Sequence, residues 1–176
     1  MINSIATTQD LMKLTASDVM TSPVTTVHLQ DSIHDVAKIF VENNISCLAV
    51  VDLGGNPLGV ITKSDLARYD MERANLSLSE NDKNPDRAHG ASEDPVASGF
   101  HLEPEDATIE SWMNPTLFDV HPSTILPAVI KKMVKNGLHH IFVVEGETRK
   151  LKGVISTFDL MMILQRLLNP ADAVPA

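Results

Sequence analysis

An eight-residue pattern occurs twice in the chain. Residues 59–66 read GVITKSDL and residues 153–160 read GVISTFDL, so a glycine, two aliphatic residues, a hydroxyl residue and an Asp-Leu pair return at the same spacing. The flanking sequence repeats too, at an offset of 93 that becomes 94 after one extra residue in a turn. Turns tolerate insertions, so this shift does not weaken the match. The 176-residue chain is therefore predicted to hold two copies of one structural unit.

Each copy predicts the same order of secondary-structure elements. A short strand comes first, and an amphipathic helix follows it. The apolar face of this helix consists of Ile33, Val36, Ala37, Phe40 and Val41 in the first copy and of Leu126, Val129, Ile130, Met133 and Val134 in the second. Two strands come next, ISCLAVVD with LGVIT or LHHIFVVE with KGVIS, and then a closing helix, SDLARY or TFDLMMILQRLL. The fold class is α/β (α+β). The two β-α-β-β-α motifs are expected to pack through their sheets into one pseudo-twofold module, because one motif is too small to cover its own sheet.

Negative charge is concentrated between the two copies. From residue 69 to residue 108 the chain carries ten acidic and three basic side chains, a net of −7 out of a total of −9. Apolar residues in this stretch follow no sustained period, which is typical of a solvated tether or of a segment that docks a partner protein. The expected organisation is an N-terminal segment (1–14), a first motif (15–69), an acidic flexible linker (70–106), a second motif (107–170) and a tail (171–176).

The composition excludes several classes of partner and location. A net charge of −9 argues against nucleic acid, because phosphate backbones are bound by an excess of Lys and Arg. The apolar runs are only strand-sized, so no membrane span is expected. The first residues lack the basic and apolar regions of a secretory signal. The single cysteine, Cys47, fits a reducing compartment, and the cytoplasm is the expected location.

The repeated corner has two interpretations. Thr62 and Ser156 stand where a strand is predicted to turn into a helix, each with an aspartate three residues later, Asp65 and Asp159. Such a pattern is typical of a helix cap, in which the hydroxyl accepts backbone N–H groups. The same corner suits a nucleotide, since free N–H groups at a helix start bind phosphate and a carboxylate binds ribose hydroxyls.

The order of motifs resembles a tandem pair of CBS domains. The resemblance lies in DVMTSPVTTV, a helix, ISCLAVVD and GVITKSDL, repeated as SWMNPTLFDV, a helix, LHHIFVVE and GVISTFDL, and it covers about residues 15–69 and 107–168. It implies a regulatory module without catalytic activity or catalytic cofactor, with two clefts that bind AMP, ADP, ATP, S-adenosylmethionine or related adenosyl ligands. It also implies a homodimer and a regulated protein, which the sequence does not identify.

The resemblance also implies site residues, taken position by position. One cleft, which we call the Asp159 cleft, would consist of Asp159, Ser156, Val154, His139, Val24, Thr25, Ile45 and Ser46, with His140 as a further phosphate contact. The other, the Asp65 cleft, would consist of Asp65, Thr62, Val60, Leu117, Phe118 and Leu138.

The two clefts depart differently from a His-Arg pair that is common in AMP-binding members of the family. The first copy has Ser46-Cys47 at those positions, without a cation, and the second has His139-His140. An ordinary histidine, with a pKa of about 6.5, is mostly neutral at pH 7. Phe118 either stacks on a base or fills its cleft. The Asp159 cleft is therefore the one expected to bind a ligand.

Other functions remain as alternatives. A ligand-free structural module would dimerise and dock a partner through the linker or the surface of the module. A metal at His139-His140 is not expected, because neighbouring strand residues point to opposite faces. Cys47 in an apolar strand is predicted to be a packing residue. The Met-rich closing helix, apolar on more than one side, is predicted to form a dimer contact.

Overall fold

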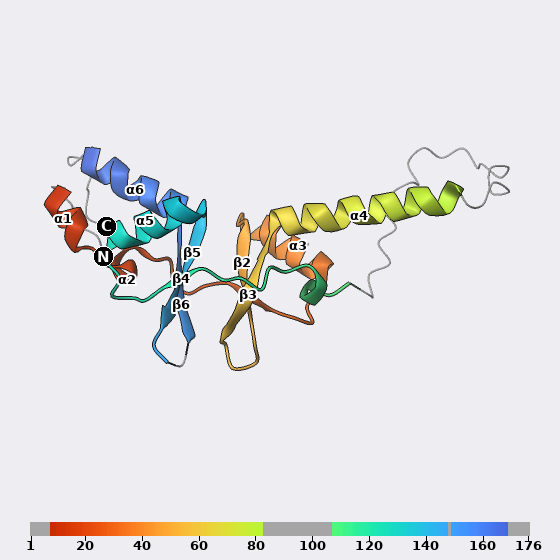
Figure 1. Cartoon of the computed structure of the whole chain (residues 1–176), viewed down its shortest axis with the longest axis horizontal. Helices are drawn as coiled ribbons and strands as arrows, with labels where there is room; N and C mark the ends of the chain where they lie inside the picture. Colours follow the sequence, from red (N-terminus) through yellow and green to blue (C-terminus); the bar gives the residue numbers. More distant parts are fainter. Residues whose placement is uncertain (1–7, 83–106, 148, 169–176) are drawn as a thin grey trace. The chain divides into compact units, whose positions relative to one another are not determined.

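The computed structural model of the chain describes residues 8–82, 107–147 and 149–168. The chain divides into two compact units. Unit 1 contains Met1–His28, Leu48–Val60 and Asn114–Ala176, and unit 2 contains Leu29–Cys47 and Ile61–Met113. The predicted mixed α/β class and the order β-α-β-β-α are confirmed in both copies (Figure 1).

The first copy contains a three-stranded sheet in the order β1-β2-β3. Its elements are β1 (Thr26–His28), α3 (Ile33–Glu42), β2 (Cys47–Val51), β3 (Pro57–Thr62) and α4 (Lys63–Asp82). Strands β1 and β2 are parallel, with Val27 opposite Val50. The parallel pair needs a crossover, and α3 supplies it.

The second copy repeats this arrangement in the order β4-β5-β6. Its elements are β4 (Asp119–Val120), α5 (Leu126–Asn136), β5 (His140–Glu145), β6 (Lys150–Ser156) and α6 (Thr157–Leu168). Strands β4 and β5 are parallel, whereas β5 and β6 are antiparallel, with His140 opposite Ser156. The start of α6 agrees with the helix predicted from TFDLMMILQRLL.

Helices and the second sheet enclose the core of unit 1. Figure 1 shows α1 (Thr8–Lys13), α2 (Ala16–Val19), α5 and α6 together on one side of the β4-β5-β6 sheet. The buried core is formed by Ala16, Val19, Val120, Leu126, Val129, Met133, Ile141, Val143, Ile155 and Ile163. Not every apolar residue of the predicted helix faces is buried. Val41 and Val134, at equivalent positions, are each 77% exposed.

Two lead-in segments, residues 14–21 ahead of β1 and residues 107–114 ahead of β4, each bind the other motif in the same way. In the first segment, the Ala16 N–H donates to the Thr124 carbonyl at 2.8 Å, and the Leu126 N–H donates to the Leu14 carbonyl at 2.7 Å. In the second segment, the short 3₁₀ helix η2 (Ile109–Ser111) does the same in unit 2. There the Ile109 N–H donates to Asp31 and the Ile33 N–H donates to Ala107, each at 3.1 Å. Each lead-in segment therefore completes the helical layer of the other motif.

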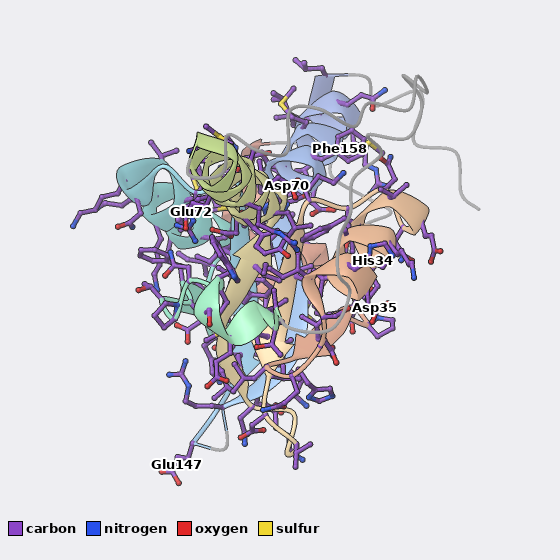
Figure 2. All side chains as sticks on the ribbon, turned by 90° about the vertical axis from the view of Figure 1, so that its right-hand side faces the viewer. His34, Asp35, Asp70, Glu72, Glu147 and Phe158 are labelled. Carbon is purple, nitrogen blue, oxygen red and sulfur yellow. The ribbon has the colours of Figure 1, made fainter. Side chains whose placement is uncertain are left out.

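Helix α4 continues past the predicted start of the acidic linker. The linker was expected to begin at residue 70, but the helix continues to Asp82. The sequence of residues 70–82 contains no glycine or proline, and many of its residues are good helix formers, so the helix has no reason to end at Tyr69. Figure 2 shows Asp70 and Glu72 on this helix. Residues 83–106, the rest of the predicted linker, lie outside the described residues. Within the described part of the chain, no helix is long and apolar enough to cross a membrane.

Candidate functional site

The corner at Asp159 is a closed hydrogen-bonding unit at the start of α6. The Ser156 N–H and the Ser156 hydroxyl both donate to Asp159 Oδ2, at 2.7 and 2.6 Å. The Asp159 N–H donates back to Ser156 Oγ at 3.2 Å. One oxygen of the carboxylate therefore caps the helix, as the capping interpretation predicts, and Oδ1 takes no part in this cap.

The other oxygen of Asp159 meets a residue that sequence reasoning missed. The Thr21 hydroxyl donates to Asp159 Oδ1 at 3.3 Å. Thr21 is held there because its N–H donates to the Val154 carbonyl at 2.8 Å and the Val154 N–H donates to the Thr21 carbonyl at 3.1 Å. This bridge joins the first motif's lead-in segment to the second motif's repeated strand. The repeat itself held a signal, since Met20-Thr21 aligns with Met113-Asn114 at the offset of 93.

The two histidines of β5 differ in their surroundings. His140 is half-buried and lies opposite Ser156 in the sheet. Burial lowers the pKa of His140, the neighbouring His139 lowers it further, and Asp159 acts in the opposite direction. His139 is exposed, and its carbonyl accepts a hydrogen bond from the Thr157 N–H at 2.9 Å. The neutral form of His140, one of the two histidines that the sequence offers as phosphate contacts, is therefore favoured.

The remaining residues assigned to the Asp159 cleft are only partly brought together. Val24 lines a pocket of about 300 Å³, whose lining residues are Ser22, Pro23, Val24, Thr26, Val51, Gly55, Leu151 and Lys152. Asp159 and Ser156 do not line this pocket. Thr25 is exposed, and Ile45 and Ser46 belong to unit 2. The structure thus places Ser156, Val154, His140 and Asp159 at one corner, with Thr21 in addition.

The corner at Asp65 has the same cap. The Thr62 N–H and the Thr62 hydroxyl donate to Asp65 Oδ2 at 2.9 and 2.7 Å, and the Asp65 N–H lies 3.4 Å from Thr62 Oγ1. Its free oxygen has a different partner from that of Asp159. Nη2 of Arg68 lies 3.4 Å from Asp65 Oδ1, so a cation replaces the threonine hydroxyl.

Arg68 is the centre of an aromatic cluster in unit 2. Its Nη2 also donates to the Trp112 carbonyl at 3.0 Å, and its guanidinium lies 5.7 Å from the centre of the Trp112 ring. Tyr69 meets Trp112 edge-on at 5.1 Å, and the Tyr69 hydroxyl accepts a hydrogen bond from Arg73 at 2.8 Å. The cluster holds the second motif's lead-in segment against α4.

The four apolar residues assigned to the Asp65 cleft belong to unit 1, whereas Asp65 and Thr62 belong to unit 2. Phe118 and Leu138 are partly buried against the core of unit 1, which favours the interpretation of Phe118 as a space-filling residue. Leu117 is half-buried. Val60 exchanges two backbone hydrogen bonds with Asn114, at 2.9 and 2.8 Å.

A capping unit of this kind is not by itself a ligand site. Thr15 with Asp18 and Ser32 with Asp35 form comparable units at the starts of α2 and α3. In Figure 2, Asp35 is labelled on α3. These caps lie outside the repeated GVI corners, and they provide internal controls for the two corners that do follow a repeated strand.

Cys47 and the histidines show no sign of metal or nucleophilic chemistry in the part of the chain that the structure describes. Burial raises the pKa of the Cys47 thiol to about 12, and Asp65 contributes to the rise. Among the described residues, no three His, Cys, Asp or Glu side chains are grouped as a metal site requires. The burial of the Cys47 thiol is compatible with the predicted packing role.

The chain belongs to the CBS domain family. The family matches residues 16–72 and 109–166, more than half of the chain, and it matches twice. Two curated relatives come from Methanocaldococcus jannaschii. The uncharacterised protein MJ1426 is 41% identical over 58 residues, which are 33% of this chain and 34% of that protein. L-aspartate semialdehyde sulfurtransferase is 26% identical over 143 residues, which are 81% of this chain and only 22% of that enzyme. The chain thus spans about a third or less of the length of these relatives.

Solved CBS domain pairs have the same fold. The CBS domain pair of MJ0100, in complex with 5′-methylthioadenosine and S-adenosylmethionine, is 24% identical with a TM-score of 0.61, over 86% of this chain and 96% of that one. CBSX2 in complex with AMP is 19% identical with a TM-score of 0.63, over 88% of this chain and 98% of that one. At these identities the similarity establishes the fold of a CBS pair.

Proposed function

We propose that the chain is a non-catalytic regulatory module that binds an adenosyl ligand at its repeated corners and changes conformation or assembly in response. Membership of the CBS domain family supports this function. Two structural neighbours support the ligand class, since one was solved with 5′-methylthioadenosine and S-adenosylmethionine and the other with AMP. A ligand acts in such a module by binding one arrangement more tightly than another.

The observation that carries the proposal is that the two oxygens of each carboxylate have different partners. In both corners Oδ2 is fixed by the cap, while Oδ1 has one partner among the described residues, the Thr21 hydroxyl at Asp159 or Arg68 at Asp65, and both partners are exposed. A carboxylate oxygen accepts more than one hydrogen bond, so Oδ1 retains capacity for a ribose hydroxyl. The cap keeps the side chain in one rotamer, which lowers the entropic cost of binding.

A catalytic role is not proposed. The similarity to L-aspartate semialdehyde sulfurtransferase covers 22% of that enzyme and supplies no assignment of its activity to this chain. The thiol of Cys47, with its pKa raised to about 12, is a poor nucleophile at neutral pH. Regulation of another protein, which stays unidentified, fits the family better.

The exposed face of α6 favours homodimerisation as part of the same function. Phe158, Met161 and Leu168 are 71%, 60% and 70% exposed, and they lie on one side of the helix (Phe158 is labelled in Figure 2). Exposed apolar residues grouped in this way mark interaction surfaces. We propose a second copy of the chain as the partner. If the corners prove empty, this surface supports the alternative of a ligand-free interaction module.

The test of ligand binding uses the caps as matched controls. Isothermal titration with AMP and with S-adenosylmethionine is performed on the wild type, Asp159→Ala, Asp65→Ala and Asp35→Ala. All three substitutions remove the carboxylate of a capping unit and leave its hydroxyl, so each is expected to cost less than the loss of an N-cap residue, which is about 0.5–2 kcal/mol. The proposal predicts that only Asp159→Ala and Asp65→Ala reduce binding. Equal binding by all four folded proteins would show that these carboxylates are caps and nothing more.

A further inference from the structure

The two corners carry different charges at equivalent positions. At the offset of 94, Lys63 corresponds to Thr157 and Arg68 corresponds to Met162. These positions match in three dimensions, because the Lys63 N–H donates to the Ser46 carbonyl just as the Thr157 N–H donates to the His139 carbonyl. Each corner also begins a helix, so the helix dipole is common to both. At these two aligned positions the first copy carries two cationic side chains, of which Arg68 contacts Asp65, whereas the second copy carries two uncharged ones.

Arg68 has unused hydrogen-bonding capacity. Its two hydrogen bonds, to Asp65 and to the Trp112 carbonyl, both come from Nη2. In the described part of the chain its Nη1 and Nε make no hydrogen bond, so three of the five N–H donors of the guanidinium are available. The side chain is 55% exposed, and the contact to Asp65 is long at 3.4 Å. A phosphate can therefore bind this fork without breaking a strong interaction.

The Asp159 corner is a weaker site for an anion than the Asp65 corner. Met162 stands in place of Arg68, and Thr157 stands in place of Lys63. His140, which lies opposite Ser156 in the sheet, has its pKa lowered by burial and by His139, so its neutral form is favoured near pH 7. The Asp159 carboxylate itself repels an anion. The hydroxyl of Thr21 and the carboxylate instead suit the uncharged hydroxyls of a nucleoside.

We propose that the two corners divide adenosyl ligands by charge: the Asp65 corner takes the phosphate-bearing ligand through Arg68, and the Asp159 corner takes an adenosyl ligand without a phosphate. This inference rests on the proposed function and deepens it. It also differs from the sequence-based prediction that the Asp159 cleft is the one that binds a ligand. That prediction rested on Ser46-Cys47, which brings no cation to hold a phosphate. Arg68 supplies that charge from the helix that follows the strand.

The test compares two probes that share adenosine and differ in phosphate, AMP and 5′-methylthioadenosine. Affinities are measured for the wild type, Asp65→Ala, Asp159→Ala and Arg68→Met. The sole tryptophan, Trp112, contacts Arg68, so its fluorescence reports on the Asp65 corner. AMP is expected to change Trp112 emission and to lose affinity in Asp65→Ala. Arg68→Met is expected to weaken AMP about tenfold or more, the value of a charge-assisted hydrogen bond, and to leave 5′-methylthioadenosine unchanged.

A second experiment moves the arginine from the Asp65 corner to the equivalent position of the Asp159 corner. Met162→Arg, placed in the Asp65→Ala background, is expected to restore AMP binding at the Asp159 corner, whereas Met162→Gln is not. If AMP binding depends on Asp159 and ignores Arg68, the division by charge is wrong while the proposed function stands. If neither probe binds the folded wild type at millimolar concentration, both the inference and the proposed adenosyl function are overturned.

Discussion

Gly59 lies directly beneath the carbonyl oxygen of Asn114. A side chain at Gly59 would collide with that oxygen and would reach Pro115 Cα at 3.0 Å. The equivalent Gly153 lies beneath the side chain of Met20. The repeated glycine is therefore explained by close approach: the backbone of each GVI strand is bridged by the other motif's lead-in segment, through Val60 with Asn114 and through Val154 with Thr21.

Alanine at the two glycines is expected to destabilise the protein to different degrees. Gly59→Ala presses a methyl group against backbone, which cannot move without breaking the hydrogen bonds between Val60 and Asn114. Gly153→Ala meets the flexible Met20 side chain, which can shift. We expect Gly59→Ala to lower the free energy of unfolding by about 1–3 kcal/mol and Gly153→Ala to lower it less. Urea denaturation of both variants measures the free energy of unfolding. Equal losses in the two variants would contradict the claim that the backbone at Asn114 yields less than the side chain of Met20.

The lowered pKa of His140 leads us to expect that the protein loses stability in mild acid. Because burial lowers its pKa below the ordinary 6.5, the folded state favours the neutral ring. The stabilisation is complete above the unfolded pKa and is lost as the pH falls through the lower pKa of the folded state. The loss is expected to be smaller than about 1.4 kcal/mol per pH unit, the value for one fully linked proton, because the ring is only partly buried.

The His140 effect is measured as the free energy of unfolding at about pH 7.5 and about pH 5.5, a window above the titration of ordinary carboxylates. His140→Gln is expected to remove part of the acid loss that the wild type shows. His34→Gln, at an exposed position on α3, serves as the control, because His34 is not among the groups that shift the pKa of His140. An acid loss that is unchanged in His140→Gln would show that another group causes it.

Cys47 is expected to be inert toward thiol reagents in the folded protein. With its pKa raised to about 12, its thiolate population near pH 8 is roughly a thousandfold below that of a free cysteine. Ellman's reagent is expected to react with it only after unfolding. The control is the double variant Ser46→Cys with Cys47→Ser, which moves the thiol to the exposed neighbouring position. Rapid modification of folded wild-type protein would contradict the assignment of Cys47 to packing.

If the exposed apolar face of α6 forms the dimer contact, one charged substitution in that face is expected to disrupt the dimer. Met161→Glu places a carboxylate in the exposed apolar stripe and is expected to convert the dimer to a monomer, because an unpaired charge at an interface is costly to desolvate. Met71→Glu on α4 is the control, since Met71 is also exposed, at 68%, but lies outside the stripe. Sedimentation velocity gives the masses. A monomeric wild type, or loss of the dimer in both variants, would remove the basis for this interface.

The sequence predicts the elements and the caps well, because both depend on local spacing. The period of α3 and α5 and the hydroxyl-x-x-aspartate corners are short-range patterns, and Asp65 and Asp159 form the capping units that such patterns imply. Contacts between segments far apart in the chain were not predicted. The bond from Thr21 to Asp159 spans 138 residues and depends on the exchange of lead-in segments.

The length of α4 and the direction of Arg68 show a second limit of sequence reasoning. A charged helix with no apolar period resembles a linker, so residues 70–82 were assigned to one. Arg68 was not recognised as a partner of Asp65, because a long side chain has several directions open to it until Trp112 supplies a ring and a carbonyl.

The most direct test of the central claim is a thermal-shift titration of the purified protein with AMP, ADP, ATP, S-adenosylmethionine and 5′-methylthioadenosine. A ligand present at about 100 times its Kd adds about 2.7 kcal/mol to the free energy of unfolding, which raises the Tm measurably. We predict that at least one of these ligands raises the Tm of the wild type and does not raise that of the Asp65→Ala/Asp159→Ala double variant. A folded wild type whose Tm responds to none of them would contradict an adenosyl-binding function.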